Sequence, residues 1–273
     1  MVRTNHNRQN TVFSLLVIGF TIILAVFIFS AVGMVILRGL PGLSREILSP
    51  EIWSSIKLSL VTSLISTGCC VLYAVPVAYT LSHYSFRGKK MIGTLLSIPL
   101  ALPPLVSGVA LLLLFGTTSW GQALAAHGIK FVFTPLGIIL AQFFVNVPYM
   151  VKISRTTFDS IDARLEFIAR TLGSTRLQAF VSVTIPLSFH GFAAGALITW
   201  ARALGEFGAV LMLVGATRGK TDILPISLYL NMSTGDLDMA LTSATILIII
   251  SVVSLFVFEW LGENGASSNK NRI

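Results

Sequence analysis

Three consecutive residues, Gly219-Lys220-Thr221, have the chemistry of a phosphate-binding loop. In the pattern G-x-x-x-x-G-K-[ST], backbone N–H groups and the lysine hold the phosphates of a nucleotide. Here only three residues separate Gly215 from the second glycine, one fewer than the pattern requires. Such a loop also follows a strand and opens a helix, whereas an apolar run precedes this one and Pro225 soon follows it. The sequence therefore predicts an outer loop rather than a nucleotide site, with candidate residues Arg218, Gly219, Lys220 and Thr221.

Two charged residues, Arg202 and Glu206, lie four positions apart inside an apolar run. On one helix they would share a face. Charges at membrane depth usually face a protein interior or water and pair with each other. The pair is therefore expected either to line a translocation path or to form a structural ion pair that orients its helix.

A proline cluster interrupts a second apolar run, "SIPLALPPLVSG". Each proline removes a helix donor, and the freed carbonyls need partners inside a bundle or a wet cavity. The segment is interpreted either as a kinked, pore-lining helix or gate, or as an ordinary kink in a packed helix. The candidates for the translocation path are Pro103, Pro104, Ser107, Arg202 and Glu206.

The sequence does not contain the residue sets that catalysis or metal binding would need. Cys69 and Cys70 are adjacent, so they cannot form an ordinary structural disulfide. No cysteine and histidine cluster has metal-ligand spacing, and no nucleophile, base and orienting group can be matched. The chain is expected to be neither an enzyme nor a metal protein.

The composition places the chain in a membrane. It has 273 residues, of which 54% are hydrophobic and 11% charged, whereas soluble domains are about 25% charged. The net charge of +8 comes from residues spread among short loops. It is therefore interpreted as a sign of membrane topology, and nucleic-acid binding is not expected.

Six apolar stretches are long enough to cross a bilayer, which takes roughly 20 residues. We therefore predict an all-α polytopic helical bundle with spans at about 12–37, 55–82, 91–116, 132–151, 191–214 and 239–261. The first stretch is interpreted as a retained anchor because it is too long for the apolar part of a typical signal peptide. The transmembrane domain is predicted over 50–262.

The distribution of basic residues predicts the orientation. Of the 19 lysines and arginines, twelve fall in segments on the side of the N-terminus, six fall on the other side and Arg202 lies within a span. Because cytoplasmic loops are enriched in lysine and arginine, we predict a multi-pass cell-membrane protein with both termini inside. The termini themselves, 1–11 and 263–273, are expected to be cytoplasmic tails.

One cytoplasmic segment, 152–188, is long and has the pattern of a helix-turn-helix elbow. Leu165, Ile168, Ala169 and Leu172 form one apolar stripe of a first helix. Gly173 allows a turn, and Ser174 or Thr175 can cap a second helix that Pro186 would end. An apolar stripe of this kind is expected to pack either against a protein partner or on the lipid surface.

The elbow resembles the cytoplasmic "EAA" motif of type I ABC-importer permeases, E-A-A-x3-G-x9-I-x-L-P. Gly173 and Pro186 match the glycine and the proline at the correct spacing. Of the first three positions only Ala169 matches, and Glu166 supplies an acid one residue early. The residues that would contact the ATPase on this resemblance are Leu165, Glu166, Ala169, Gly173, Leu177 and Pro186.

A second stretch, "ARALGEFGAVLMLVGATRGKTDILPISLY", looks like the fifth span and outer loop of the molybdate/tungstate permeases. The related sulfate permeases carry a similar R-A-x-x-E-[FY]-G segment. The resemblance covers roughly 50–262 and implies the six-span fold of a type I ABC-importer permease.

The resemblance also implies a set of partners. It implies a second copy of the chain, two cytoplasmic ATPase subunits that use ATP and Mg, and an extracytoplasmic substrate-binding protein. The chain itself would bind no cofactor. The implied function is import of molybdate or tungstate. The alternatives are a sulfate or thiosulfate permease and, from another class, an ion-coupled carrier or channel.

Overall fold

The computed structural model describes residues 2–46 and 49–270, and within those ranges it contains helices and no strand. The predicted all-α class is confirmed. The helices are α1 Val2–Glu46, α2 Pro50–His83, α3 Lys89–Ala101, α4 Pro104–Gly116, α5 Ser119–Ala126, α6 Pro135–Asp159, α7 Ala163–Thr171, α8 Arg176–Ala179, the π-helix η1 Phe180–Thr184, α9 Ile185–Leu204, α10 Gly208–Val214, α11 Leu224–Thr234 and α12 Leu237–Lys270.

Five stretches of the described helices are long and apolar enough to span a membrane. They are 13–43, 50–83, 135–159, 176–204 and 237–257. A sixth crossing is available only if α3 and α4, which meet at a bend of 110°, count as one broken span. The structure thus contains two helices where the sequence suggested one span over 91–116.

Other boundaries also differ from the predicted ones. Helix α6 continues to Asp159 and α9 begins at Ile185, so the elbow is the shorter segment 160–184. The predicted span 191–214 is interrupted after Leu204, where Gly205 ends α9. Helices α1 and α12 run well into the predicted tails, to Val2 and Lys270.

Helices α2, α6 and α9 pack together through small polar residues. Helix α2 buries Ser55, Ser59, Thr62, Ser63 and Ser66, which recur at helical spacing on one face. Small residues let helix backbones approach closely where lipid provides no hydrophobic driving force between helices. Trp200 on α9 donates its indole N–H to the Ser63 hydroxyl at 2.9 Å, so one hydrogen bond ties α9 to this face.

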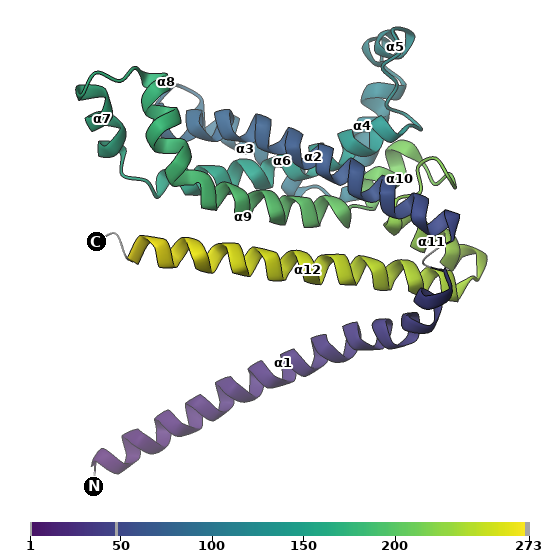
Figure 1. Ribbon diagram of the computed structural model, residues 1–273, viewed down its shortest axis with the longest axis horizontal. Coiled ribbons are helices and arrows are strands. Elements are labelled where there is room, and N and C mark those ends of the chain that lie inside the picture. The colour runs from purple at the N-terminus through teal and green to yellow at the C-terminus, as the bar shows by residue number, and fades with distance from the viewer. Residues whose placement is uncertain (1, 47–48, 271–273) are drawn as a thin grey trace.

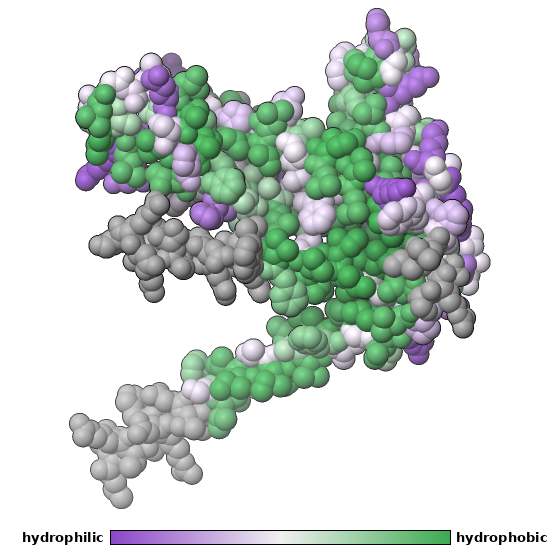
Figure 2. Space-filling model, viewed as in Figure 1, coloured by the Kyte–Doolittle hydropathy of each residue, from purple (hydrophilic) through white to green (hydrophobic). Residues whose placement is uncertain are grey.

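The long helices run along one direction, and the two ends of the bundle differ (Figure 1). Helices α7 and α8 lie at one end, here the elbow end, together with the start of α1 and the finish of α12. Helices α10 and α11 lie at the opposite end, here the loop end. Figure 2 shows hydrophobic surface over the middle of the molecule and hydrophilic residues gathered at both ends, as a membrane protein requires.

Helix α1 touches the bundle only near its C-terminal end, where it packs against α12 and then diverges from it (Figure 1). Gly39 makes this contact possible because a Cβ there would lie 2.7 Å from the Leu241 carbonyl oxygen. The large side chains of its apolar part are exposed in the isolated chain. Helix α1 therefore lies outside the packed core.

Candidate functional site

The elbow has a defined geometry that its own sequence encodes. The Asp162 carboxylate accepts the Arg164 N–H at 2.9 Å and caps α7. Gly173 ends the helix with a φ of +99°, in the left-handed region that favours glycine. Its N–H bonds to Arg170 and the Ser174 N–H bonds to Ala169, both at 3.1 Å, which is a Schellman motif.

The second elbow helix begins with a capping box. Thr175 accepts the Gln178 N–H at 3.3 Å, and Gln178 accepts the Thr175 N–H at 2.8 Å. Of the two predicted caps, Ser174 or Thr175, the structure uses Thr175. Because the turn between the helices is fixed at both sides, the elbow can transmit a displacement as one body.

Large apolar side chains of the elbow point outward. Leu172 is 83% exposed and Leu177 is 71% exposed, and Leu165 and Ile168 are also exposed. The predicted stripe is therefore left uncovered by the part of the chain that the structure describes, although Ala169 is half-buried. An exposed apolar surface of this kind marks a lipid or protein contact.

Glu166 points the other way, into the subunit. One carboxylate oxygen accepts the Tyr79 hydroxyl at 2.7 Å. The other accepts the Thr184 hydroxyl at 3.1 Å and lies 3.7 Å from His83 Nε2. The Glu166 side chain is only 14% exposed. It connects α7 to the end of α2 and to η1, and we name these contacts the Glu166 latch.

Aromatic packing holds the α2 side of this latch in place. The Tyr79 ring stacks on His83 at 4.2 Å between centroids and meets Phe158 and Phe180 edge-on. These rings come from α2, α6 and η1. The latch and its aromatic neighbours therefore join α7 to η1 within the elbow and to α2 and α6 in the bundle. Sequence patterns gave no sign of the latch because its residues are distant along the chain.

Pro186 does not end the second elbow helix, contrary to the sequence prediction. The chain runs from α8 through η1 into α9 without a break, and Pro186 lies in the first turn of α9. A proline lacks the N–H of a regular helix, and a wider π-turn before it accommodates that loss. The elbow is consequently continuous with a membrane span on its C-terminal side.

Two successive prolines explain the break between α3 and α4. The residue before a proline is forced into extended backbone, and both Leu102, with ψ of 137°, and Pro103, with ψ of 138°, are extended. Pro104 then begins α4 and packs against Gly208. The break places the α3–α4 corner beside the start of α10.

Ser107 lies at the same contact and is fully buried. Its hydroxyl has no hydrogen-bond partner among the described residues. The adjacent Gly108 approaches α10 so closely that a Cβ there would lie 2.6 Å from the Ala209 carbonyl oxygen. In this conformation Ser107 is enclosed rather than lining an open path.

Arg202 and Glu206 do not pair in the described structure, contrary to the expected helical pair. Helix α9 ends at Leu204, so the two residues are not on one helical face. The Arg202 guanidinium lies 3.7 Å from the Tyr149 ring centroid, a cation–π contact. The Glu206 carboxylate accepts the Ala209 N–H at 3.1 Å and is largely buried beside α10.

The segment containing Gly219-Lys220-Thr221 is a closed loop at the loop end. The Lys220 and Thr221 N–H groups both bond to the Thr217 carbonyl, at 3.2 and 3.0 Å. The Thr221 hydroxyl accepts the Thr217 N–H and donates to the Gly215 carbonyl. A phosphate-binding loop needs free amides and a free hydroxyl, and here these groups hold the loop together.

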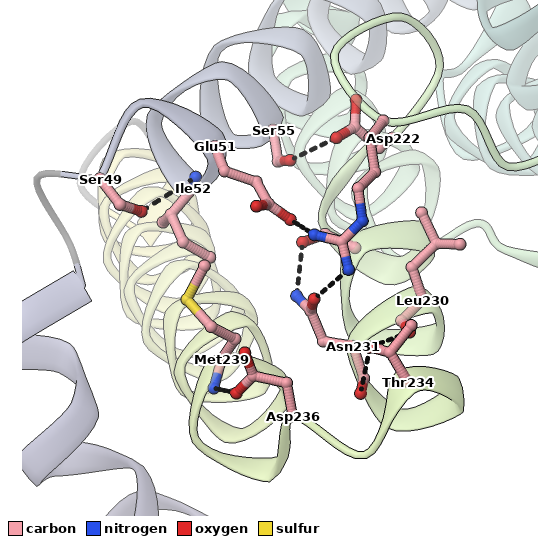
Figure 3. Close-up of polar contacts among 12 residues, drawn as sticks. Ser49, Glu51, Ile52, Ser55, Asp222, Leu230, Asn231, Thr234, Asp236 and Met239 are labelled. Carbon is pink, nitrogen blue, oxygen red and sulfur yellow. Dashed lines mark hydrogen bonds and ion pairs between the residues drawn. The ribbon is translucent and has the colours of Figure 1, made fainter.

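Arg218 anchors this loop to its neighbours, and Figure 3 shows the acceptors Glu51 and Asn231 from two different helices. It forms an ion pair with Glu51 on α2 and donates to Asn231 on α11 at 2.8 Å. Ser55 donates to Asp222 at 3.5 Å, next to the same cluster. Lys220 in contrast is exposed, so it is the loop's free cation among the described residues.

The chain is similar to known proteins over most of its length. Residues 71–264 match the family described as "Binding-protein-dependent transport system inner membrane component". The chain is 37% identical over 223 residues to a probable molybdenum ABC transporter permease protein of Haloferax volcanii, covering 82% of this chain and 80% of that protein.

Two further relatives differ in the solute that they are named for. The chain is 34% identical to the molybdate/tungstate transport system permease protein WtpB of Pyrococcus furiosus, covering 84% of this chain and 86% of that protein. It is 30% identical to the sulfate transport system permease protein CysT of Salmonella typhimurium, covering 78% of this chain and 77% of that protein.

A solved structure shares the fold at low sequence identity. The chain matches a bacterial alginate ABC transporter, in complex with an alginate pentasaccharide-bound periplasmic protein, with a TM-score of 0.70. The identity is 17%, and the match covers 92% of this chain and 93% of that chain. The shared arrangement extends over nearly the whole chain.

Proposed function

The chain belongs to the family of binding-protein-dependent transport system inner membrane components and is the permease subunit of an ABC importer, and we propose that it carries molybdate or tungstate. The predicted family and the predicted type I permease fold are confirmed. The observation that supports the solute is the identity of 37% and 34% to relatives named for molybdenum and for molybdate/tungstate.

The energy for import comes, on this proposal, from two cytoplasmic ATPase subunits that bind ATP and Mg. Each elbow of a permease homodimer sits in a groove on one ATPase subunit, as a helix in a groove. The exposed side chains of Leu165, Leu172 and Leu177 fit this contact because burial of apolar surface stabilises association. The elbow end then faces the cytoplasm, with both termini.

The Glu166 latch gives the elbow a physical connection to the spans. When ATP draws the ATPase subunits together, the elbow moves with them, and the latch passes the displacement to α2 and η1. On the other side η1 continues directly into α9. The bundle can then switch between inward-open and outward-open states as packed bodies rather than by bending.

The loop end receives the solute from an extracytoplasmic binding protein. Arg218 contributes little net charge there because Glu51 pairs with it. Lys220 and Lys57 remain, and they line one shallow pocket. Neither lysine has an ion-pair partner among the described residues, and Lys57 lies 5.1 Å from the Trp53 ring centroid. The two lysines lower the electrostatic barrier to an entering dianion but form no dense anion-binding ring, which fits solute selection by the binding protein.

A sulfate or thiosulfate importer is the second candidate, favoured by the 30% identity to the sulfate permease. Uptake by the complete complex in proteoliposomes separates the two. We expect ATP-dependent uptake of molybdate that an equal concentration of tungstate suppresses, while sulfate needs a large excess. Equal suppression by sulfate would assign the sulfate class. Uptake that continues without the ATPase would indicate an ion-coupled carrier instead.

A further inference from the structure

A cavity lies between α3 and α6, apart from both the elbow surface and the outer loop. Its volume is about 950 Å³, far more than a single water molecule occupies. Four cations line it, namely Lys89 and Lys90 from the first turn of α3 and Lys152 and Arg155 from α6. All four come from the elbow ends of their helices.

The cavity becomes apolar away from these cations. At a rise of about 1.5 Å per residue, Leu100 lies roughly 15 Å along α3 from the first lysines. Leu96, Leu100, Ala101 and Pro148 line this deeper part. The cavity is therefore a slot with a cationic mouth at the elbow end and an apolar floor toward the membrane interior.

The positive charge of the mouth is not neutralised within the described residues. Arg155 has a partner, because its Nε lies 3.5 Å from an Asp159 carboxylate oxygen. Ser82 also donates to Asp159, at 2.5 Å. The three lysines have no ion-pair partner in the described ranges. An excess of three positive charges therefore faces one cavity.

The start of α3 adds to this field. The helix follows Gly88, which has a φ of +89°, and no side chain caps its N-terminus. Its first turn contains no acidic residue. The N-terminus of a helix carries a partial positive charge that is stabilised by an anion, so an anion in the mouth would meet both lysines and helix N–H groups.

We propose that this cavity binds a tetrahedral oxyanion carrying up to two negative charges. Lysine ammonium groups hold such an anion as point charges. The oxyanion is either free in the cytoplasm-side water or the phosphate of an anionic phospholipid, whose acyl chain would occupy the apolar floor. Basic pockets between transmembrane helices bind lipid headgroups in this way. The placement of this mouth on the cytoplasmic side rests on the proposed function.

The test uses the full chain in the complex that it forms, with one variant from each wall. Lys89→Gln and Lys152→Gln each remove one mouth charge. Arg87→Gln is the matched control, because it removes one charge two residues from Lys89 without lining the cavity. One arm measures radiolabelled sulfate binding in discs of neutral phosphatidylcholine. The other counts retained phosphatidylglycerol by native mass spectrometry.

We expect each mouth variant to weaken binding about fivefold, and the control variant less than about twofold, in the arm that holds the true ligand. A loss confined to the sulfate arm assigns a free oxyanion, and a loss confined to the lipid arm assigns a headgroup. The proposal is overturned if the three variants behave alike in both arms.

Discussion

At the scale of single residues, Glu166 is the side chain that most directly ties the elbow to the membrane spans. Its carboxylate accepts hydroxyl groups from Tyr79 and Thr184. Hydrogen bonds to a charged group contribute about 1.5–3 kcal/mol. We predict that Glu166→Lys, which replaces the acceptor with a donor of opposite charge, lowers solute uptake at least about tenfold while ATP hydrolysis by the complex continues.

The ratio of uptake to ATP hydrolysis in proteoliposomes measures this uncoupling. Glu166→Gln is the matched control, because its amide oxygen still accepts one of the two hydroxyl groups and should retain most of the coupling. Tyr79→Phe removes only the shorter hydrogen bond and should fall between the two. A normal ratio in Glu166→Lys would mean that the latch does not transmit the elbow's motion.

Gly173 ends the first elbow helix with a backbone conformation that other residues adopt at a cost. Its φ is +99°, and nothing lies within 4 Å of a Cβ built there, so the cost of substitution is conformational rather than steric. We predict that Gly173→Val disturbs the turn by about 1–2 kcal/mol and lowers coupling, whereas Gly173→Asn largely preserves it.

Limited proteolysis of the elbow and the uptake ratio measure this effect. Gly68→Ala on α2 is the control, because that glycine also has open space around it but no left-handed backbone. If Gly173→Val behaved like Gly68→Ala, the fixed turn would have no part in coupling.

The sequence predicted which residues would form the elbow but not which way they face. The spacing of Leu165, Ile168 and Leu172 correctly placed an apolar stripe, and the structure exposes it. The direction of Glu166 depends on Tyr79, 87 residues away along the chain. Arg202 and Glu206 were predicted to share one helical face, and this prediction failed for a similar reason. The helix ends at Leu204, between the two residues, so the helical periodicity does not continue from one to the other.

At the scale of elements, the corner between α3 and α4 depends on close packing as well as on proline. Gly108 is the point of closest approach to α10, where a Cβ would also lie 2.7 Å from the Met212 Cβ. We predict that Gly108→Ala destabilises the protein by about 1–3 kcal/mol through overpacking. Gly93→Ala on α3, with open space around it, should change stability little.

Thermal unfolding of the two variants in the same detergent measures the difference. Equal unfolding temperatures would mean that α4 and α10 are not rigidly packed. The sequence indicated a kink at Pro103-Pro104, and the conformational rule for residues before proline accounts for it. It did not indicate the 110° bend, because the angle is fixed by contacts with α10.

The outer loop provides a second test at this scale. Lys220 is exposed, while the amides of Lys220 and Thr221 are used within the loop. We predict that Thr221→Val loosens the loop by removing two hydrogen bonds, and proteolysis at the loop measures this effect.

We also predict that Lys220→Ala leaves nucleotide binding by the complex unchanged, and binding of a fluorescent ATP analogue measures this. Lost nucleotide binding in Lys220→Ala would restore the phosphate-loop interpretation.

At the scale of the whole molecule, hydropathy predicted the helical membrane class because every backbone polar group in lipid must be satisfied within a helix. Each of the apolar stretches centred near residues 25, 70, 140 and 250 lies in a helix that could cross a membrane. The arrangement of the helices around α2 required the structure, since buried serine and threonine side chains give no apolar signal.

The central claim is that this chain is the permease subunit of an importer whose ATP hydrolysis takes place in a separate subunit. Purification of the tagged protein from its native membrane in mild detergent, followed by quantitative mass spectrometry, tests it most directly. We predict an ATP-binding subunit in equal amount with the permease. A chain that purifies alone and moves an anion into liposomes without ATP would contradict the account.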